Sequence, residues 1–374
     1  MRILQLSDLH LGKRLKEYSL IADQRYVLEQ ALDLIKEEKL DACFLCGDIY
    51  DSSVPSAEAT VLYDEFLAKL HALGIEVFII SGNHDSADKL HFGKAVFEAE
   101  KIHIVTRVEE SLTPIPLGDD VMIYQLPFIR SLDVNEAFET AAKGTSEAIK
   151  EVLGRMNIDT KKTNILLAHQ AVFPFNGKLL VGGSEELLSE DGEAVGDVAS
   201  VDASLFKDFD FVALGHIHKA QNVAKNARYA GSILKYHRDE ASSEKSFTII
   251  NAEKKNVTYS TKPIHFLHDV VLMKGTLEEI LQADGDKNAY VFALLDDKSL
   301  VEDPMAKLKI KYPYAAWVDY SSHESSLPDM HVADIEHVSK EKLFSDFYLS
   351  QNGEPLSEEQ IKIVHGLLGE KEEK

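Results

Sequence analysis

The segment Arg2-Ile-Leu-Gln-Leu-Ser-Asp-Leu-His10 leads from an apolar strand into two side chains that can bind a metal. Its first part, Arg2–Ser7, has the composition of a buried strand. Asp8 and His10 follow it two residues apart, and side chains with that spacing leave a strand on the same face. A carboxylate and an imidazole at this position can therefore hold one metal ion.

The same arrangement, an apolar strand that ends in polar residues, recurs four more times in the first 218 residues. Loops beyond the carboxyl ends of strands form the ligand crevice of an open α/β sheet, so the five clusters can converge on one site. The further apolar runs are Ala42–Cys46, Glu76–Ser81, Asn164–Ala168 and Phe209–Leu214, and they lead to Gly47-Asp48, Gly82-Asn83-His84-Asp85, His169 and Gly215-His216-Ile217-His218.

Helical patterns separate the first strands. Apolar residues repeat at helical spacing in 23–38 and in 60–73. Alternating strands and helices predict a layered α/β domain. The later segments Tyr229–Ser232, Ser246–Asn251 and Asn256–Ser260 have strand patterns and suggest a second sheet packed on the first. We therefore predict a two-sheet sandwich flanked by helices.

The pattern changes near Lys262-Pro263. With 374 residues, the chain exceeds the roughly 150 residues of a typical domain. We assign residues 1–262 to the metal-binding domain and residues 263–335 to a small α/β unit. Its predicted elements are the strand His268–Met273, the helix Leu277–Ala283, the strand Ala289–Leu295, the helix Pro304–Lys311 and the strand Ala315–Tyr320.

Residues 336–374 have the pattern of a helical hairpin. The first helix covers Lys340–Tyr348, with Leu343, Phe344 and Phe347 on one side. Ser357 and Gln360 have capping-box spacing at the start of the second. A hairpin at a chain end either packs on its own domain or docks on a partner helix, and the pattern is compatible with both.

Composition and charge limit the class of protein. Hydrophobic residues make up 45% of the chain and charged residues 28%, as in folded globular proteins. No apolar run reaches the ~18 residues of a membrane span, which predicts a cytoplasmic protein. The net charge of −23 argues against a chain that binds nucleic acid through its own basicity. Either the substrate is small, or metals and a basic partner supply the attraction.

Cys43 and Cys46 have the spacing of a redox motif. Thioredoxin-type pairs lie at the start of a helix, whereas this segment has the pattern of a buried strand. Residues three apart on a strand point to opposite faces, so we favour core packing over redox or zinc chemistry.

The ligand types of the five clusters indicate a two-metal phosphoesterase. Carboxylate, amide oxygen and imidazole together suit manganese, iron or zinc. Two metals ~3.5–4 Å apart need a bridging carboxylate, for which Asp48 is the candidate, and they would activate a water for attack on a phosphate. His84, next to Asn83, is placed to protonate the leaving group, and Asp85 can orient it.

The five clusters belong to longer motifs, which are Ser7-Asp-Leu-His-Leu-Gly12, Gly47-Asp-Ile-Tyr-Asp51, Ser81-Gly-Asn-His-Asp85, Ala168-His-Gln170 and Gly215-His-Ile-His218. In these motifs the sequence resembles the calcineurin-like metallophosphoesterase superfamily, and within it the nuclease subunits of bacterial DNA-repair complexes of the SbcCD type. Many phosphomonoesterases of the superfamily instead carry Gly-His-Thr-His at the last motif.

The resemblance implies a role for each residue of the clusters. His84 matches the catalytic histidine, and both metals would usually be Mn²⁺, with Mg²⁺, Fe²⁺ or Zn²⁺ as possible replacements. Archaeal relatives have a second functional histidine near the place of Asp51, so the role of Asp51 stays open. One metal would be held by Asp8, His10, Asp48 and His218, and the other by Asp48, Asn83, His169 and His216.

The resemblance also implies a DNA phosphodiesterase for repair, recombination and replication, with double-strand exonuclease and single-strand or hairpin endonuclease activity. Residues 263–335 would cap the site and face DNA, and residues 336–374 would grip an SbcC-like coiled-coil ATPase. The nuclease would be a homodimer within a heterotetramer. The alternative is a small-substrate metallophosphoesterase acting on nucleotides or metabolites, which would not need the C-terminal units. A second alternative is a scaffold that keeps the fold without catalysis. The intact ligands at all five clusters argue against it, because a scaffold would not need them.

Overall fold

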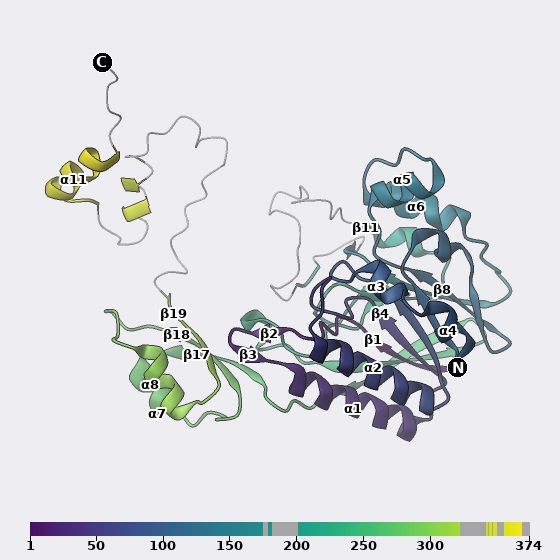
Figure 1. Cartoon of the computed structure of the whole chain (residues 1–374), viewed down its shortest axis with the longest axis horizontal. Coiled ribbons are helices and arrows are strands. Elements are labelled where there is room, and N and C mark those ends of the chain that lie inside the picture. The colour runs from purple at the N-terminus through teal and green to yellow at the C-terminus, as the bar shows by residue number, and fades with distance from the viewer. Residues whose placement is uncertain are drawn as a thin grey trace, which may run out of the picture. The chain divides into compact units, whose positions relative to one another are not determined.

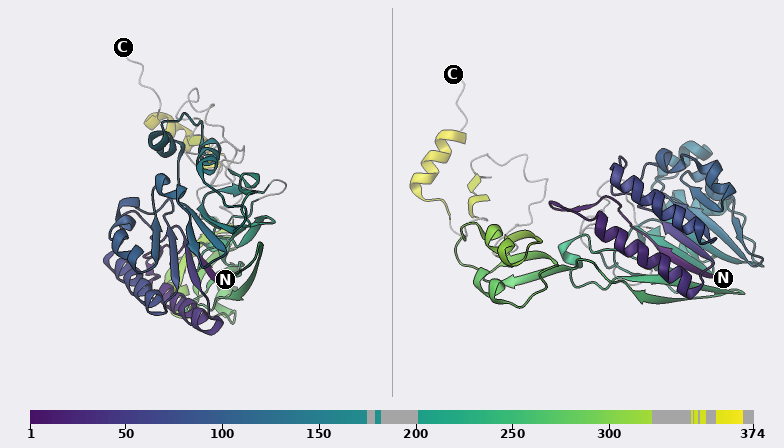
Figure 2. Two further views of the ribbon diagram at one scale, coloured as in Figure 1. Left: turned by 90° about the vertical axis from the view of Figure 1, so that its right-hand side faces the viewer. Right: turned by 60° about the horizontal axis from the view of Figure 1, so that its bottom comes forward.

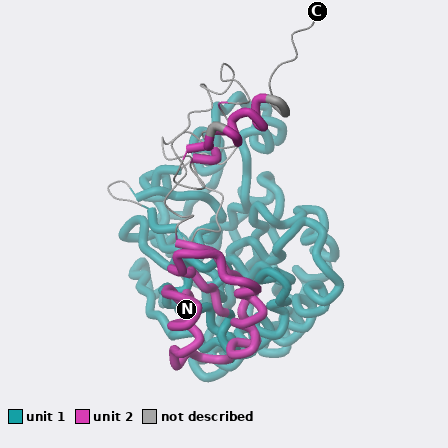
Figure 3. The backbone as a smooth tube through the Cα atoms, turned by 90° about the vertical axis from the view of Figure 1, so that its left-hand side faces the viewer, with its two compact units in different colours: residues 1–271, 288–290 teal, residues 272–287, 291–374 magenta. Residues whose placement is uncertain are grey.

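The computed structural model describes residues 1–174, 179–181, 201–321, 342, 344, 345, 347–349 and 355–368. The chain forms two compact units (Figure 3). Unit 1 consists of Met1–Val271 and Asn288–Tyr290, and unit 2 of Leu272–Lys287 and Val291–Lys374. All five predicted clusters therefore belong to unit 1.

Unit 1 contains a first sheet of six strands in the order β16-β15-β1-β4-β5-β6. Figure 1 labels its central strands β1 and β4. Strands β1, β4, β5 and β6 are parallel, and β15 pairs antiparallel with β1 and with β16. The strands are β1 Arg2–Leu6, β4 Ala42–Cys46, β5 Glu76–Ile80, β6 Ile102–Val105, β15 Ser246–Glu253 and β16 Asn256–Pro263.

The second sheet also has six strands, in the order β13-β14-β12-β9-β8-β7. Its four central strands β14, β12, β9 and β8 are parallel. The strands are β7 Ile115–Leu117, β8 Val121–Leu126, β9 Thr163–His169, β12 Phe211–Gly215, β13 Gln221–Ala224 and β14 Ala227–Tyr229.

The two sheets pack face to face on one apolar core, as predicted for the sandwich. Phe44 and Phe78 of the first sheet and Ile165 and Leu167 of the second are fully buried in this core. Cys46 belongs to the same core, and both Cys43 and Cys46 are buried free thiols. Burial raises the pKa of each thiol far above its ordinary value, so both stay protonated and pack as small apolar groups.

The prediction that three later segments form the second sheet is wrong. The segments at 246–251 and 256–260 extend the first sheet as β15 and β16. Of the three segments, only the one predicted at Tyr229–Ser232 lies in the second sheet, where the strand β14 ends at Tyr229. The second sheet is built mainly from β8, β9 and β12, which carry the same apolar pattern as the first sheet. Apolar alternation identifies a strand but not the edge with which it pairs.

Helices cover the outer faces of the sandwich. Figures 1 and 2 show α1 (Ile21–Glu38) and α2 (Ala57–Ala72) side by side on the first sheet. The helices α5 (Ser131–Phe138) and α6 (Thr145–Arg155) pack on the second sheet. Shorter elements are α3 Ala87–His91, α4 Lys94–Ala99, β2 Arg14–Leu15, β3 Tyr18–Ser19, β10 Val172–Phe173, β11 Val201–Asp202 and the 3₁₀ helices Val108–Leu112, Ala203–Phe206 and Arg238–Glu240.

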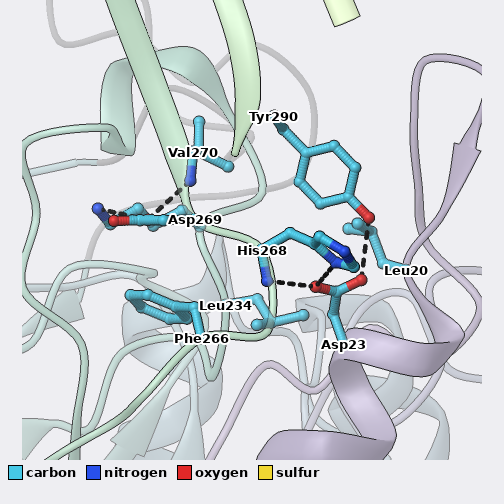
Figure 4. Close-up of a pocket in the computed structure, with 9 residues that line it drawn as sticks. Leu20, Asp23, Leu234, Phe266, His268, Asp269, Val270 and Tyr290 are labelled. Atoms are coloured by element: carbon cyan, nitrogen blue, oxygen red, sulfur yellow. Dashed lines mark hydrogen bonds and ion pairs between the residues drawn. The ribbon is translucent and has the colours of Figure 1, made fainter. Parts of the chain in front are cut away.

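The buried carboxylate of Asp23 fixes the C-terminal end of unit 1. It accepts hydrogen bonds from the backbone nitrogen of His268 (3.1 Å), from His268 Nδ1 (2.9 Å) and from the hydroxyl of Tyr290 (2.9 Å). Figure 4 shows the imidazole and the phenol converging on this carboxylate at the start of α1. These hydrogen bonds attach residues 268 and 290 to α1.

Unit 2 contains a three-stranded sheet in the order β17-β18-β19, with its own apolar core. Its elements are β17 Val270–Gly275, α7 Leu277–Gln282, β18 Tyr290–Leu295, α8 Pro304–Lys311, β19 Ala315–Tyr320 and α11 Glu358–Leu368. The predicted capping box of α11 is present, since Ser357 N donates to Gln360 Oε1 (2.8 Å) and Gln360 N to Ser357 Oγ (3.3 Å).

The rest of the predicted hairpin is described only in part. Residues 342, 344, 345 and 347–349 are helical. Leu343, Asp346 and residues 322–341, 350–354 and 369–374 lie outside the described residues. Among the residues that the structure does describe, no helix is long and apolar enough to cross a membrane.

Candidate metal centre

The five predicted clusters lie together in loops at the carboxyl ends of β1, β4, β5, β9 and β12. Backbone hydrogen bonds join neighbouring loops, for example from Asp8 N to Gly47 O (3.1 Å) and from His10 N to Asp48 O (3.0 Å). A side-chain bond joins the two sheets, because Asp8 Oδ1 accepts from His216 N (3.0 Å). Strands from both sheets therefore supply one site.

The first group of donors consists of Asp8, His10 and His218, which we call half one. The Nε2 atoms of the two imidazoles lie 3.1 Å apart. Each of the three residues offers a ligand atom within 4.8 Å of the others. Ligands ~2.0–2.2 Å from a metal lie roughly 3 Å from one another, so this spacing fits one metal ion.

The second group consists of Asn83, His169 and His216, which we call half two. Asn83 Oδ1 lies 3.2 Å from His169 Nε2 and 2.9 Å from His216 Nδ1. Asp48 lies between the halves, since its Oδ2 is 3.6 Å from His10 Nε2 and 3.4 Å from His169 Nε2. This is the place of a bridging carboxylate, and the donor set fits two metals such as manganese, iron or zinc.

The site is buried, and its carboxylates and imidazoles shift one another's pKa. Burial alone would raise the pKa of Asp48, but the imidazoles of His169 and His10 outweigh it and hold the pKa well below the ordinary value. Burial lowers the pKa of His169, yet the Asp48 and Asp8 carboxylates raise it to about 9. The pKa of His216 falls to about 3 because of burial and the neighbouring His169. Neutral imidazole nitrogen is the form that binds metals.

His84 lies at the edge of the two halves. Its backbone nitrogen donates to Asp48 Oδ1 (2.9 Å), and its Nδ1 lies 3.0 Å from the carbonyl oxygen of Asp51. A carbonyl only accepts, so Nδ1 carries the proton of this bond and Nε2 is the atom that can exchange a proton with a substrate. The ring centroid lies 4.8 Å from that of His10.

The carboxylate of Asp85 has a different environment from the predicted one beside His84. It accepts from the backbone nitrogens of Ile49 (3.1 Å), Tyr50 (2.9 Å) and Gly82 (2.9 Å). It therefore joins the loops after β4 and β5, and the Asp51 carbonyl takes the position of an orienter for His84. Burial and the charge of Asp48 raise the pKa of Asp85 to about 6.

The backbone of the site is strained where the ligands lie. Asp8 (φ 51°), His10 (φ 42°) and Asp48 (φ 49°) occupy the left-handed region, which is uncommon for non-glycine residues. Gly82 is required by close approach, because a Cβ there would lie 2.1 Å from Asp48 Oδ1. The glycine before Asn83 thus leaves room for the Asp48 carboxylate.

Three further residues support the site and were not predicted from the sequence. Glu240 lies behind His218, with its Oε1 3.4 Å from His218 Nδ1. The Tyr236 ring contacts the rings of His10 and His218, with centroids 5.4 and 5.8 Å apart. Gln24 Nε2 donates to the carbonyl oxygens of Leu9 (3.1 Å) and His10 (2.7 Å). None belongs to a recognisable motif, so a single sequence gives no signal for them.

Comparison with known proteins assigns the family. The model of the calcineurin-like phosphoesterase family matches residues 1–220. The SbcD subunits of the nuclease SbcCD from Staphylococcus epidermidis and Staphylococcus saprophyticus are 32% and 30% identical, each over 98% of this chain and 98% of the relative. The structure of a dimetal phosphatase from Danio rerio matches with a TM-score of 0.41 and 10% identity over 71% of this chain and 99% of that one, a likeness too low to add to the assignment. The chain therefore belongs to the calcineurin-like phosphoesterase family, and within it to the SbcD family of nuclease subunits.

Proposed function

We propose that the chain is a metal-dependent DNA phosphodiesterase, with double-strand exonuclease and single-strand or hairpin endonuclease activity. The observation that carries the proposal is the convergence of two donor groups on Asp48 Oδ2. Half one with Asp48 would hold one Mn²⁺, and half two with Asp48 would hold the other. Bound there, the ions would polarise the phosphate and lower the pKa of a water between them.

His84 would assist the leaving group. With Nδ1 against the Asp51 carbonyl (3.0 Å), an imidazolium would present its Nε2 proton to the substrate side. Transfer of that proton to the departing 3′ or 5′ oxygen avoids the release of an unprotonated alkoxide. The hydrogen bond from His84 N to Asp48 Oδ1 would hold this acid next to the bridging carboxylate.

The choice of DNA rests on the relatives and on the parts outside the metal centre. The similar proteins are named as subunits of a nuclease, and each match covers 98% of the chain. A small substrate would not need unit 2 with its separate core. We therefore propose that residues 263–335 cap the site and face DNA. A net charge of −23 then requires that a partner supplies part of the DNA binding.

Apolar side chains support two protein contacts. In α11, Ile361 and Ile363 are 51% and 62% exposed, and we propose that residues 336–374 dock on an SbcC-like coiled-coil ATPase. Around α3 and α4, Phe92 is 85% and Val96 69% exposed, which supports a homodimer of this chain within a heterotetramer. We propose that this assembly acts on DNA in the cytoplasm, in repair, recombination and replication.

A substrate panel tests the proposal. The purified chain with Mn²⁺ is given linear duplex DNA, a single-stranded circle, a hairpin and a generic phosphomonoester, with Asp48→Asn as the inactive control. We expect cleavage of the DNA substrates. Hydrolysis of the monoester alone would replace the proposal with a small-substrate phosphoesterase, which the acidity of the chain would also suit.

The partner is tested by deletion. Removal of residues 340–374 should abolish co-purification with the coiled-coil ATPase and leave basal hydrolysis unchanged. Undiminished co-purification would contradict the docking assignment.

A further inference from the structure

Behind His218 lies a carboxylate that the reaction described above does not use. Glu240 Oε1 is 3.4 Å from His218 Nδ1, and both side chains are almost fully buried. The opposite nitrogen, His218 Nε2, faces the other imidazole of half one at 3.1 Å. The imidazole is therefore held between the metal position and Glu240.

Glu240 is itself held on both oxygens. Oε1 also accepts from Tyr236 N (3.2 Å), and Oε2 accepts from Lys245 Nζ. Lys245 Nζ in turn donates to the carbonyl oxygen of His218 (2.8 Å) and to Ser232 Oγ (2.7 Å). The side chains of Glu240 and Lys245 are 1% and 2% exposed. This ion pair thus contacts both the side chain and the backbone of the ligand.

Burying such a pair is costly. Removing a carboxylate and an ammonium from water costs several kcal/mol per ion, and an apolar pair of similar volume often gives equal or greater stability. Stability of the loop alone therefore does not account for two charges at this place. A carboxylate behind an imidazole accepts its Nδ1 proton, fixes the tautomer, and leaves the Nε2 lone pair free for a metal.

We propose that Glu240, held by Lys245, is a positioning residue that orients His218 and raises its affinity for the metal of half one. This inference rests on the proposed two-metal function. Outer partners of metal-binding histidines are worth about 10–100-fold in metal affinity. The metal of half two does not depend on Glu240, because none of its ligands contacts that carboxylate among the described residues.

Metal binding is measured by calorimetric titration of the metal-free full chain with Mn²⁺, and bound metal is counted by elemental analysis. Glu240→Gln should weaken one of two binding events about 10–100-fold and leave the other within about twofold. Glu244→Gln, an exposed glutamate beside Lys245, is the matched control and should bind both ions as the wild type does.

The single variant leaves Lys245 buried without its counterion, which can prevent folding. The double variant Glu240→Gln/Lys245→Met removes both charges together and keeps similar volumes. We expect it to fold with a circular dichroism spectrum like that of the wild type, and to show the same loss at one site. Wild-type affinity for both ions in this folded variant would overturn the inference.

A thermodynamic cycle distinguishes positioning from a general effect on the fold. In a His218→Ala background, Glu240→Gln should change affinity at half one by less than about twofold, because its target is gone. An equal loss with and without His218 would show that Glu240 does not act through this ligand. Failure of the wild type to bind two ions would instead refute the proposed function, so the two failures are distinguishable.

Discussion

The two halves lie on either side of Asp48 but are supported differently. In half one, each imidazole has a carboxylate behind it, Asp51 Oδ1 at 3.4 Å from His10 Nδ1 and Glu240 Oε1 at 3.4 Å from His218 Nδ1. In half two, His169 Nδ1 donates to the carbonyl oxygen of Cys46 at 2.7 Å.

The remaining imidazole of half two is less supported. His216 Nε2 is buried without a hydrogen-bond partner among the described residues. His10 Nδ1 of half one makes no hydrogen bond there either, but the Asp51 carboxylate oxygen lies 3.4 Å from it. Carboxylates make a ligand imidazole more basic than a neutral carbonyl does. If each half holds a metal ion as proposed, we expect the ion of half one to bind more tightly than that of half two.

The largest effect is expected where the halves meet. Asp48→Asn replaces the shared carboxylate by a neutral amide, so both metals should be lost from elemental analysis after dialysis. Activity should fall by more than the about 10²–10³-fold cost of removing a single electrostatic donor. Retention of one tightly bound ion would show that the halves do not depend on a common bridge.

His84→Ala separates chemistry from metal binding. The side chain lies beside both halves but supplies neither with a donor in our assignment, so both ions should remain. Turnover on duplex DNA should fall about 10²–10⁴-fold, the range for a lost general acid. A metal-free variant would refute the acid role.

Asp51→Asn tests the more exposed support of half one. The Asp51 side chain is 32% exposed and also pairs with Lys13 Nζ at 2.6 Å. We expect affinity for one Mn²⁺ to fall by about tenfold, the low end of the range for an outer partner. Asp88→Asn, which alters an exposed aspartate paired with Arg107, serves as the control. Weakening of both ions, or of neither, in the titration would contradict the assignment to half one.

The smallest effect concerns the fold behind half two. The Tyr229 hydroxyl accepts from Val172 N (2.6 Å) and donates to Gln170 O (2.7 Å), next to His169. Tyr229→Phe leaves this buried backbone unsatisfied and should lower the free energy of unfolding by about 1–3 kcal/mol. Urea denaturation of the metal-free chain measures it. Tyr26→Phe, at an exposed tyrosine, is the control and should stay within about 0.5 kcal/mol of the wild type. An equal change in both variants would show that the Tyr229 hydroxyl has no special stabilising role.

Much of the fold could be predicted from local patterns. The strands Ala42–Cys46 and Ala315–Tyr320 and the helix Pro304–Lys311 have the predicted bounds. Each is a short apolar or amphipathic run between turn residues, and such runs are determined locally. Strand pairing is not local, which is why β15 and β16 were assigned to the wrong sheet.

The residues of the site divide in the same way, into those that the local sequence identifies and those that only the fold brings together. Asp8, Asp48 and His216 could be selected because each follows an apolar strand, and the topology brings them together. Glu240 could not be selected, because it becomes a neighbour of His218 only through the fold of the loop after β14. The hydrogen bonds of Asp85 likewise depend on two loops that come together in space.

The central claim is that two metal ions share Asp48. Electron paramagnetic resonance of the chain loaded with Mn²⁺ tests it most directly, because ions ~3.5–4 Å apart with a bridging carboxylate are magnetically coupled. We predict the spectrum of a coupled pair at two equivalents of Mn²⁺, and an uncoupled ion at one equivalent. Spectra of uncoupled ions at every ratio would contradict a shared two-metal site.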